Sequence, residues 1–463
     1  MADWETVVGL EIHVHLKTRT KMFCRCELAY FAEPNTHTCP VCLAHPGALP
    51  VPNRIAVEWT VKLGLALGSQ IAEEAVFSRK NYFYPDNPKG YQISQYDKPL
   101  CVGGSLLVPG PDGEREIGFV RAHLEEDAAK TVHVGGATGR KVGSAHSLID
   151  FNRAGTPLVE IVTQPDIRSA DEAMRFLRLL RQTIVELGIS DAEMEKGTLR
   201  VDANVSVRQP GEEFRTRWEL KNMNSFTFIG RGIEAAARAQ VAAYESGGAV
   251  EQHTYDYEPD TDTLTPHRTK EEADDYRYFP EPDLVPVRPE RDVVERLRAQ
   301  VPEAPGARIR RYSGELGYER AAELVTNDRD RHAEALVEHG VAFEGAAAFV
   351  MNNEFLLDNA GAVAEIVKHR DEIPRKVFDD ALAAAGDPGF DAAPYLAQKA
   401  VADTSALEPI VDEVLAAHPD NVAAYKGGKT GLLGFFVGQV MQRTNGTADA
   451  RVVNELLRAK LDA

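Results

Sequence analysis

The chain has 463 residues, 43% of them hydrophobic, and its 71 acidic residues against 52 Lys and Arg give a formal net charge of −19. This composition supports two or three domains with sizeable cores, and the charge argues against a protein that coats nucleic acid by bulk electrostatics. No apolar run reaches the roughly 18 to 20 residues of a membrane span, and the N-terminus lacks the regions of a secretion signal, so we expect a cytoplasmic protein with no membrane contact.

The first segment that points to a site is a predicted strand over residues 8–16. Its apolar residues alternate with Glu11, His13 and His15. Because side chains alternate between the two faces of a strand, these three polar side chains share one face. A solvated strand face explains any one of them, so the argument for a site depends on similar faces elsewhere in the chain.

Four of the five cysteines form two close pairs, Cys24 with Cys26 and Cys39 with Cys42, separated by twelve residues. Two short pairs are typical of a tetrahedral zinc site with four thiolates at about 2.3 Å. The alternatives are four buried free thiols or a loop that packing holds without a metal. Four thiolates fill the coordination shell, so we expect a structural role for this zinc.

Two aromatic segments each contain basic residues. Residues 77–86 contain Arg79 and Lys80, which we take as candidate phosphate ligands, and residues 274–283 surround one Arg with aromatic rings and prolines. Rings that flank an Arg can stack on a base while the guanidinium binds a phosphate. Ordinary packing explains both segments equally well.

Acidic side chains recur in two further places. Residues 123–127 read His-Leu-Glu-Glu-Asp, and Glu219 lies on the polar side of a short alternating segment, residues 217–221. With Glu11 and His13 they supply the oxygen and imidazole ligands that suit Mg²⁺ held together with substrate phosphates. Three separate segments therefore deliver acids from a polar strand face or from the end of one.

Two motifs resemble catalytic signatures but are interpreted otherwise. Gly103-Gly104-Ser105 lies among turn residues without a paired Lys or His, so we expect a turn and no serine nucleophile. Residues 423–430 resemble a phosphate-binding loop, but Ala423 replaces its first glycine and the preceding segment reads as a helix. No glutaminase signature is visible.

Periodicity predicts an α+β fold. Residues 169–188 begin with a capping box and end at a glycine, which predicts a helix, and a second helix is expected over residues 229–244. Residues 199–208 alternate as residues 8–16 do. We expect a mixed or antiparallel sheet with one face on a core and a polar, concave opposite face.

A segment with four prolines, residues 279–289, predicts an extended arm that leaves the first domain. We place a cradle domain at 1–290, a helical domain at 291–405 and a small helical tail domain at 406–463. From residue 425 onward, six Lys and Arg oppose three acidic residues, a balance of +3. This is the locally basic region that could contact nucleic acid, although the same residues can simply solvate a small helical domain.

Ten segments, in order from residue 4 to the C-terminus, resemble one family, the B subunits of the aspartyl/glutamyl-tRNA amidotransferases. They are VGLEIHVHL, CPVC, PGALPVPN, RKNYFYPDNPKGYQISQYD, HLEEDAAK, DFNRAGTPLVEIV, DANVSV, ELKNMNSF, DYRYFPEPDL and FFVGQVMQRTNG. The resemblance implies a carbon–nitrogen ligase that uses ATP to phosphorylate the carboxylate of glutamate or aspartate wrongly loaded on tRNA(Gln) or tRNA(Asn). Ammonia from a partner glutaminase then displaces the phosphate.

The resemblance also implies partners, cofactors and residues. The partners are a glutaminase of the amidase type, known as the A subunit, and a small C subunit, which complete a heterotrimer. Misacylated tRNA is the substrate, and a tail domain meets it. The cofactors are ATP, Mg²⁺ and a structural Zn²⁺. The implied magnesium and catalytic residues are Glu11, His13, Glu126 and Glu219, with Glu125 and Lys221 as additional cofactor-binding residues.

This sequence departs from the family pattern at a few positions; His15 stands where Gln is common and adds a titratable group beside the site. Two rival interpretations are a related archaeal subunit, for whose large insertion 463 residues leave no room, and a zinc-stabilised tRNA-binding scaffold without catalysis. The scaffold accounts for the cysteines and the basic tail but leaves the acids on polar strand faces unexplained.

Overall fold

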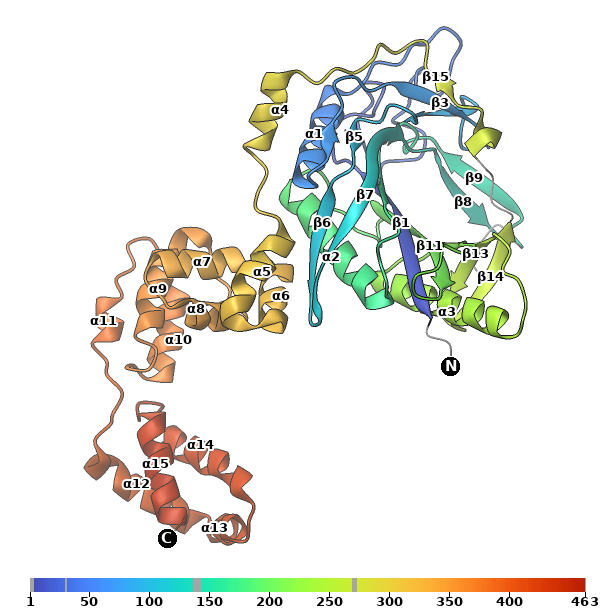
Figure 1. Ribbon diagram of the computed structural model, residues 1–463. Helices are drawn as coiled ribbons and strands as arrows, with labels where there is room; N and C mark the ends of the chain where they lie inside the picture. The colour runs from blue at the N-terminus through green and yellow to red at the C-terminus, as the bar shows by residue number, and fades with distance from the viewer. Residues whose placement is uncertain (1–3, 30, 136–142, 269–272, 463) are drawn as a thin grey trace. The chain divides into compact units, whose positions relative to one another are not determined.

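The computed structural model describes residues 4–29, 31–135, 143–268 and 273–462. By its internal contacts the chain divides into two compact units, Met1–Ala321 and Ala322–Ala463. The first combines strands and helices and the second is helical, which confirms the predicted α+β class (Figure 1). The predicted domain limits at residues 290 and 405 stay predictions. Within the described ranges, no helix is both long enough and apolar enough to cross a membrane.

The frame of the first unit is a sheet in which ten strands are described, in the order β14, β13, β12, β11, β1, β10, β7, β5, β2, with β6 paired to β7. Its pairs are antiparallel except for β12 with β13, so the sheet is mixed, as predicted. The strands are β1 Glu5–His15, β2 Gln70–Ile71, β5 Cys101–Val102, β6 Ser105–Gly110, β7 Gly113–Glu126, β10 Pro157–Thr163, β11 Leu199–Arg208, β12 Trp218–Lys221, β13 Thr254–Glu258 and β14 Thr263–Arg268.

The described part of this unit also contains two smaller sheets and several helices. The small sheets are β15–β3–β4 and the hairpin β8–β9. Their strands are β3 Phe77–Asn81, β4 Tyr91–Gln95, β8 Lys130–Val134, β9 His146–Asp150 and β15 Phe279–Pro280. The helices described are α1 Arg54–Ala66, α2 Ala170–Glu186, α3 Phe226–Glu245, α4 Arg291–Arg298 and α5 Pro305–Leu316, with the short turn η1 Ala273–Tyr276.

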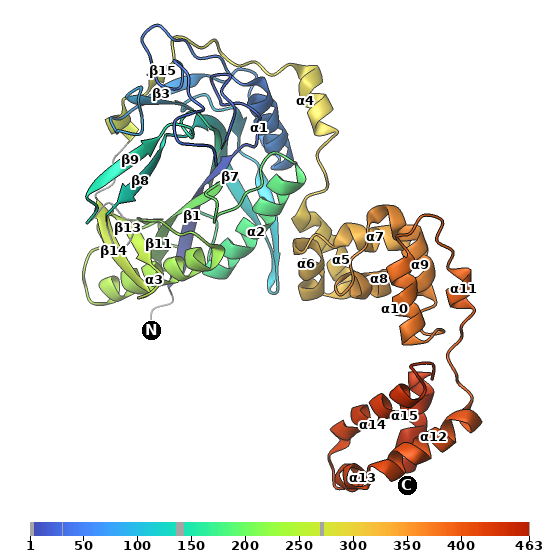
Figure 2. The same cartoon turned by 180° about the vertical axis from the view of Figure 1, so that it is seen from behind.

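The core lies between the apolar face of the large sheet and helices α2 and α3, which run along one side of it (Figure 2). Leu10, Ile12 and Val14 of β1 are buried, as their alternation predicts. Ser169 caps α2 by accepting a hydrogen bond from the Glu172 backbone N–H at 3.1 Å, so the predicted helix start is confirmed. The helices thus cover one face and leave the polar face of β1 uncovered by them.

In strand β7 the core-facing residues are odd-numbered before one position and even-numbered after it. It pairs with β10 in register Val162↔Arg121 and then Thr163↔Phe119, so Val120 is an extra residue, a β-bulge. On one side of it Phe119 is buried against Phe176 of α2. After the bulge an odd-numbered residue such as His123 points to the polar face instead, where it lines a cavity.

The proline-rich arm pairs with a sheet. Phe279 and Pro280 form β15, antiparallel to β3, and Val287 bridges Ala75. The sequence predicts an extended arm here. In the structure this arm pairs with β3 at the edge of the small sheet, a position that tolerates proline because an edge strand does not need every backbone N–H for pairing.

The Gly103-Gly104 segment is a turn, as predicted, and both glycines have positive φ, 64° and 93°. A Cβ on Gly104 would lie 2.3 Å from the carbonyl oxygen of Leu67, so only glycine fits there. Ser105 donates its hydroxyl to Glu116 at 3.3 Å.

The second unit is built of short helices: α7 Asp330–Glu338, α8 Phe343–Val350, α9 Ala360–Lys368, α10 Arg375–Ala384, α11 Ala393–Leu396, α12 Thr404–Ala417, α13 Pro419–Lys426, α14 Leu433–Arg443 and α15 Ala450–Leu461, with the turns η2 Leu357–Asn359 and η3 Thr430–Leu432. Helix α6, Tyr318–Thr326, spans the limit between the units. Leu407, Val411, Phe436, Val440 and Leu457 form a core shared by α12, α14 and α15. The residues before Gly427 are helix α13 and not a strand, so the loop that follows lacks the strand that a phosphate-binding loop needs.

Candidate active site

A polar cavity of about 830 Å³ lies over the uncovered face of β1, β7, β10, β11 and β12. Strand register explains which side chains meet there. His13 pairs with Glu160 of β10 and with Arg200 of β11, and Glu11 pairs with Asp202, so alternate residues of neighbouring strands share this face. The polar, concave face that the sequence predicts is therefore present.

One end of the cavity holds a compact cluster of one imidazole and two carboxylates. His13 Nε2 lies 3.6 Å from Glu125 Oε1 and 3.5 Å from Glu160 Oε2. One ligand atom from each of the three residues lies within 4.8 Å of the others. His123 backs the cluster, with Nε2 3.6 Å from Glu160, and Ser94 donates its hydroxyl to Glu125 at 3.2 Å.

The electrostatics of the cluster reflect crowded negative charge. Burial, and then the charge of Glu160, raise the pKa of Glu125 to about 7. Burial favours the neutral form of His13, but its hydrogen bond to Glu160 and the charges of Glu160 and Glu125 outweigh this and raise its pKa to about 9. Burial lowers the pKa of His123 to about 4, so this imidazole is neutral at pH 7. The cluster therefore attracts a cation.

These residues fit a divalent metal ion. Two carboxylates and one imidazole converge on one point, and a hard cation would replace the proton that His13 holds there and neutralise the two carboxylates. Three protein ligands leave room for substrate oxygens, which suits Mg²⁺ better than a closed structural site. His13 and Glu125 come from the predicted set, whereas Glu160 does not.

A second acidic group occupies the other part of the cavity. Lys221 Nζ lies 2.6 Å from Asp202 and 3.4 Å from Glu219, and Thr254 donates to Glu219 at 2.8 Å. Glu11 accepts a hydrogen bond from the Asn204 amide at 3.1 Å. The same cavity that holds His13 and Glu125 therefore also holds three other predicted residues, Glu11, Glu219 and Lys221.

His15 contributes to the support of this face at the end of β1. Its Nε2 lies 2.7 Å from Asp127 Oδ2, and Arg200 donates to the same oxygen at 2.9 Å. Burial disfavours the charged carboxylate, but Arg200, His15 and Arg153 outweigh it and hold the pKa of Asp127 well below its usual range. His15, which stands where Gln is common in the family, therefore belongs to a buried network of ion pairs around Asp127.

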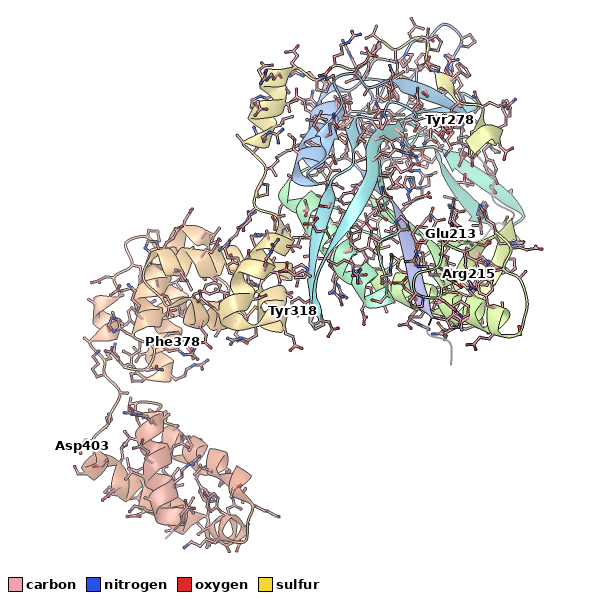
Figure 3. The ribbon with its side chains drawn as sticks, in the orientation of Figure 1. Glu213, Arg215, Tyr278, Tyr318, Phe378 and Asp403 are labelled. Carbon is pink, nitrogen blue, oxygen red and sulfur yellow. The ribbon has the colours of Figure 1, made fainter. Side chains whose placement is uncertain are left out.

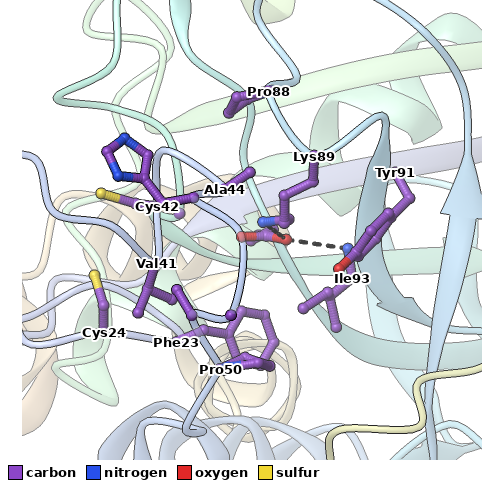
Figure 4. A pocket seen from close by; sticks show the side chains of 15 residues that line it. Phe23, Cys24, Val41, Cys42, Ala44, Pro50, Pro88, Lys89, Tyr91 and Ile93 are labelled. Atoms are coloured by element: carbon purple, nitrogen blue, oxygen red, sulfur yellow. Dashed lines mark hydrogen bonds and ion pairs between the residues drawn. The ribbon is translucent and has the colours of Figure 1, made fainter.

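Glu126 lies outside the cavity that holds Glu11 and His13. Adjacent residues of a strand point to opposite faces, so Glu125 faces the polar cavity and Glu126 faces away from it. Glu126 lines a separate cavity of about 240 Å³ beside the cysteine loop, where it forms an ion pair with Lys89 and accepts the Ile93 backbone N–H at 3.1 Å (Figure 4).

The two basic residues of β3 separate in the same way. Lys80 lines the polar cavity, 4.6 Å from the ring centre of Tyr276. Arg79 points to the other face, where Nε and Nη2 each donate to the buried carboxylate of Glu281 at 2.7 Å and the guanidinium lies over the ring of Tyr91. The structure therefore places Lys80, and not Arg79, with the candidate active site.

The four cysteines converge as their spacing predicts. Their Sγ atoms lie within 4.8 Å of one another, and Cys39 and Cys42 are 3.9 Å apart, a separation that suits thiolates around one tetrahedral ion at about 2.3 Å. A hydrogen bond from Cys24 and the nearby ammonium of buried Lys21, 3.6 Å from Cys42 Sγ, lower the pKa of Cys42 to about 4. The group fits a metal ion.

Glu160 is the residue that sequence reasoning missed. It stands alone in the apolar run Pro157–Thr163, and a single acid inside a buried strand is the signal that could have found it. The same reasoning applies to His123, whose buried imidazole contacts Glu160.

Comparison with known proteins gives two matched domains. Residues 6–295 match a family described as the GatB/GatE catalytic domain, and residues 364–461 match one described as the GatB domain. Several relatives are named as the B subunit of aspartyl/glutamyl-tRNA(Asn/Gln) amidotransferase. That of Syntrophotalea carbinolica is 45% identical over 480 residues, 99% of this chain and 98% of that protein. Those of Anaeromyxobacter sp. (strain K) and Geobacter sulfurreducens are 46% and 45% identical, over 99% or more of both chains.

Proposed function

Because the chain belongs to the GatB/GatE family, to which it is matched over residues 6–295 and by relatives that span its whole length, we propose that it is the B subunit of a tRNA-dependent amidotransferase. Its substrates are glutamate or aspartate wrongly loaded on tRNA(Gln) or tRNA(Asn). A side-chain carboxylate oxygen attacks the γ-phosphorus of ATP, and ADP leaves. Ammonia then attacks the acyl carbon, phosphate leaves, and the nitrogen loses a proton to give the amide.

The observation that carries this proposal is the cluster of His13, Glu125 and Glu160 in the polar cavity. A carboxylate and a triphosphate are both anionic, so they approach each other only where positive charge offsets their repulsion. The three side chains would hold Mg²⁺. When bound, this ion neutralises phosphate charge and orients the phosphoryl group.

The residues around the cluster supply fixed positive charge. Lys80 faces the cavity and its charge acts on Glu125 and Glu160. Lys221 is held by Asp202 and Glu219, and these carboxylates raise its pKa further although burial opposes this, so it keeps its proton. Both ammonium groups would bind the phosphates of ATP or the phosphate of the activated acyl group. In the proposal Glu219 orients Lys221, and the charge of Glu11 acts on the same lysine.

We propose further that Cys24, Cys26, Cys39 and Cys42 hold a structural Zn²⁺. The converging sulfurs support this assignment. A closed shell of four thiolates leaves no open position for chemistry, so the ion would brace the loop that walls the Glu126 cavity.

The partners follow from the reaction. Ammonia must be supplied by a glutaminase, and we propose an amidase-type A subunit together with a small C subunit in a heterotrimer. The basic stretch after residue 425 supports a tail domain that contacts the tRNA away from the reacting carboxylate. Since the substrate is a tRNA used in protein synthesis, we keep the expectation of a cytoplasmic location.

The proposal is tested by comparing Glu125→Gln with Glu126→Gln in the assembled complex. We expect Glu125→Gln to reduce misacylated-tRNA-dependent release of ADP at least 100-fold, because an amide is a poor ligand for a hard cation. Glutamine hydrolysis by the partner glutaminase should continue.

Glu126→Gln is the matched control, since it makes the same change one residue along the strand and on the other face. We expect it to retain magnesium-dependent ADP release. Full loss in Glu126→Gln with full activity in Glu125→Gln would place the metal at Glu126 and refute this assignment. Absence of tRNA-dependent ADP release in the unaltered complex would refute the proposed function itself.

A further inference from the structure

A fully buried lysine lies beside the group of four cysteines. Among the lysines that the structure describes, Lys21 is the only buried one. Exposed positions are usual for charged side chains, and Asp403 is an example (Figure 3). Burial of an ammonium is unfavourable unless hydrogen bonds and a negative charge compensate it. The contacts of Lys21 therefore indicate the role of its charge.

The Lys21 ammonium contacts two acceptors. It donates to the carbonyl oxygen of Phe151 at 3.0 Å and to Cys42 Sγ at 3.6 Å. Within the described ranges of the chain, no carboxylate forms an ion pair with it. Of the two atoms that Lys21 contacts, only the sulfur of Cys42 can carry a full negative charge, and it does so as a thiolate.

The local backbone fixes the position of this lysine. Residues 20–27 form a turn that is closed by an isolated bridge between Thr20 and Glu27. Inside this turn the Lys21 N–H donates to the carbonyl of Cys26 at 2.9 Å. The turn that carries the first cysteine pair therefore also carries the lysine, whose side chain reaches a sulfur of the second pair.

The sulfur of Cys42 is enclosed by protein. Cys42 is buried, whereas the other three cysteines of the group are partly exposed. Its Sγ accepts the Cys39 backbone N–H at 3.2 Å in addition to the lysine ammonium. Gly155 packs over both side chains, since a Cβ built there would lie 3.5 Å from Lys21 Cδ and 3.8 Å from Cys42 Cβ. Protein donors thus replace water around this sulfur.

Charge explains why an ammonium is placed here. Four thiolates around Zn²⁺ carry a formal charge of −2, because four negative charges oppose two positive ones. A charge of this size is costly to bury. One ammonium in contact with the group lowers the total to −1, and its hydrogen bond draws electron density away from the sulfur.

We propose that Lys21 is a positioning residue of the zinc site: it offsets thiolate charge and donates a hydrogen bond to the zinc-bound sulfur of Cys42. Lys21 lies outside the coordination shell and binds no metal itself. The inference rests on the zinc ion that we propose above for the four cysteines. The competing role, in which Lys21 only braces the Phe151 carbonyl, predicts no effect on the electrons of the sulfur.

The test compares Lys21→Met with Lys17→Met in the full-length chain. Lys17 is the matched control, because its exposed ammonium pairs with Asp191. Zinc affinity is measured by competition with a chelator, and the cobalt-loaded protein gives the sulfur-to-metal charge-transfer bands. We expect Lys21→Met to weaken zinc binding about 10- to 100-fold and to move these bands to longer wavelength, because a sulfur without its donor gives up electron density more readily. Lys17→Met should change neither.

Lys21→Gln is the second variant, in case methionine prevents folding. Glutamine retains a hydrogen-bond donor without the charge, so zinc binding should still weaken at least about tenfold. Unchanged zinc affinity in the lysine-21 variants would overturn the inference. Weaker zinc binding with unmoved cobalt bands in Lys21→Met would overturn it as well, and would leave Lys21 as a brace of the loop. Failure of the unaltered chain to bind zinc would instead refute the zinc assignment itself. None of these readouts depends on amidotransferase activity.

Discussion

An experiment on Arg79 can decide whether this residue stabilises the fold or binds a phosphate. The sequence predicts a phosphate ligand, whereas its guanidinium forms two 2.7 Å hydrogen bonds with Glu281, whose side chain is fully buried. Glu281→Gln removes the charge and one of the two strong acceptors and leaves the guanidinium largely buried. Breaking such a pair from one side costs about 3 to 5 kcal/mol, and we expect about 3 because the arginine is 19% exposed.

The assay is urea unfolding followed by tryptophan fluorescence. The three tryptophans, Trp4, Trp59 and Trp218, all belong to the first unit, so the signal reports that unit alone. With a slope of about 3 kcal/mol per molar urea, a loss of about 3 kcal/mol lowers the midpoint by about 1 M. The KM for ATP in the assembled complex should stay within twofold.

Glu74→Gln provides a matched control, because Glu74 pairs with Arg288 of the same arm but at the surface. Its unfolding midpoint should equal that of the unaltered protein, since exposed ion pairs contribute little. An unchanged midpoint for Glu281→Gln together with a KM for ATP raised more than fivefold would refute the reasoning and make Arg79 a nucleotide ligand.

Three further predictions follow from other parts of the chain. Elemental analysis should find one zinc per chain, and Cys42→Ser should lose it and lower the stability of the first unit; less than half an equivalent of metal in the unaltered protein would contradict the site. Gly104→Ala should destabilise the first unit by at least about 2 kcal/mol in urea unfolding, because its Cβ would strike the Leu67 carbonyl, whereas Gly103→Ala, with open space around it, should cost about 1 kcal/mol; equal losses would argue against the clash. Deletion of residues 406–463 should raise the KM for tRNA and flatten the salt dependence of its binding while glutamine hydrolysis persists; an unchanged salt slope would mean that the basic residues only solvate the tail.

The polar face of the site was predictable because it depends on local periodicity. Alternation in β1 places Glu11 and His13 together, and the structure confirms that they line one cavity. The same rule, applied to residues 123–127, places Glu125 and Glu126 on opposite faces of the strand. The family resemblance nevertheless led to Glu126 as the predicted magnesium ligand. A motif identifies a segment, whereas the parity of the strand decides which of two neighbouring carboxylates faces the substrate.

The acid in the apolar run Pro157–Thr163 marks Glu160 as unusual, but periodicity does not say which residues it meets. Its contact with His13 depends on β10 lying between β1 and β7, and the order of strands in a sheet is set by pairing between distant segments. The arm shows the same limit: its prolines predict an extended segment, but they do not say that β3 will receive it. Cysteine spacing succeeded where these failed, because a tetrahedral shell constrains residues that are close in sequence.

The bulge at Val120 gives the length of β7 a meaning of its own. Thr163 pairs with Phe119 and its neighbour Val162 pairs with Arg121, so the ladder continues past Val120 as if that residue were absent. Deleting Val120 would therefore leave a regular strand in which Phe119 still faces the core and His123 and Glu125 still face the cavity. Deleting Leu124 would instead turn either His123 or Glu125 toward the core, although every charged side chain of the site would remain in the sequence. Among relatives of this chain, a strand β7 that is one residue shorter at the bulge should therefore keep the same two faces.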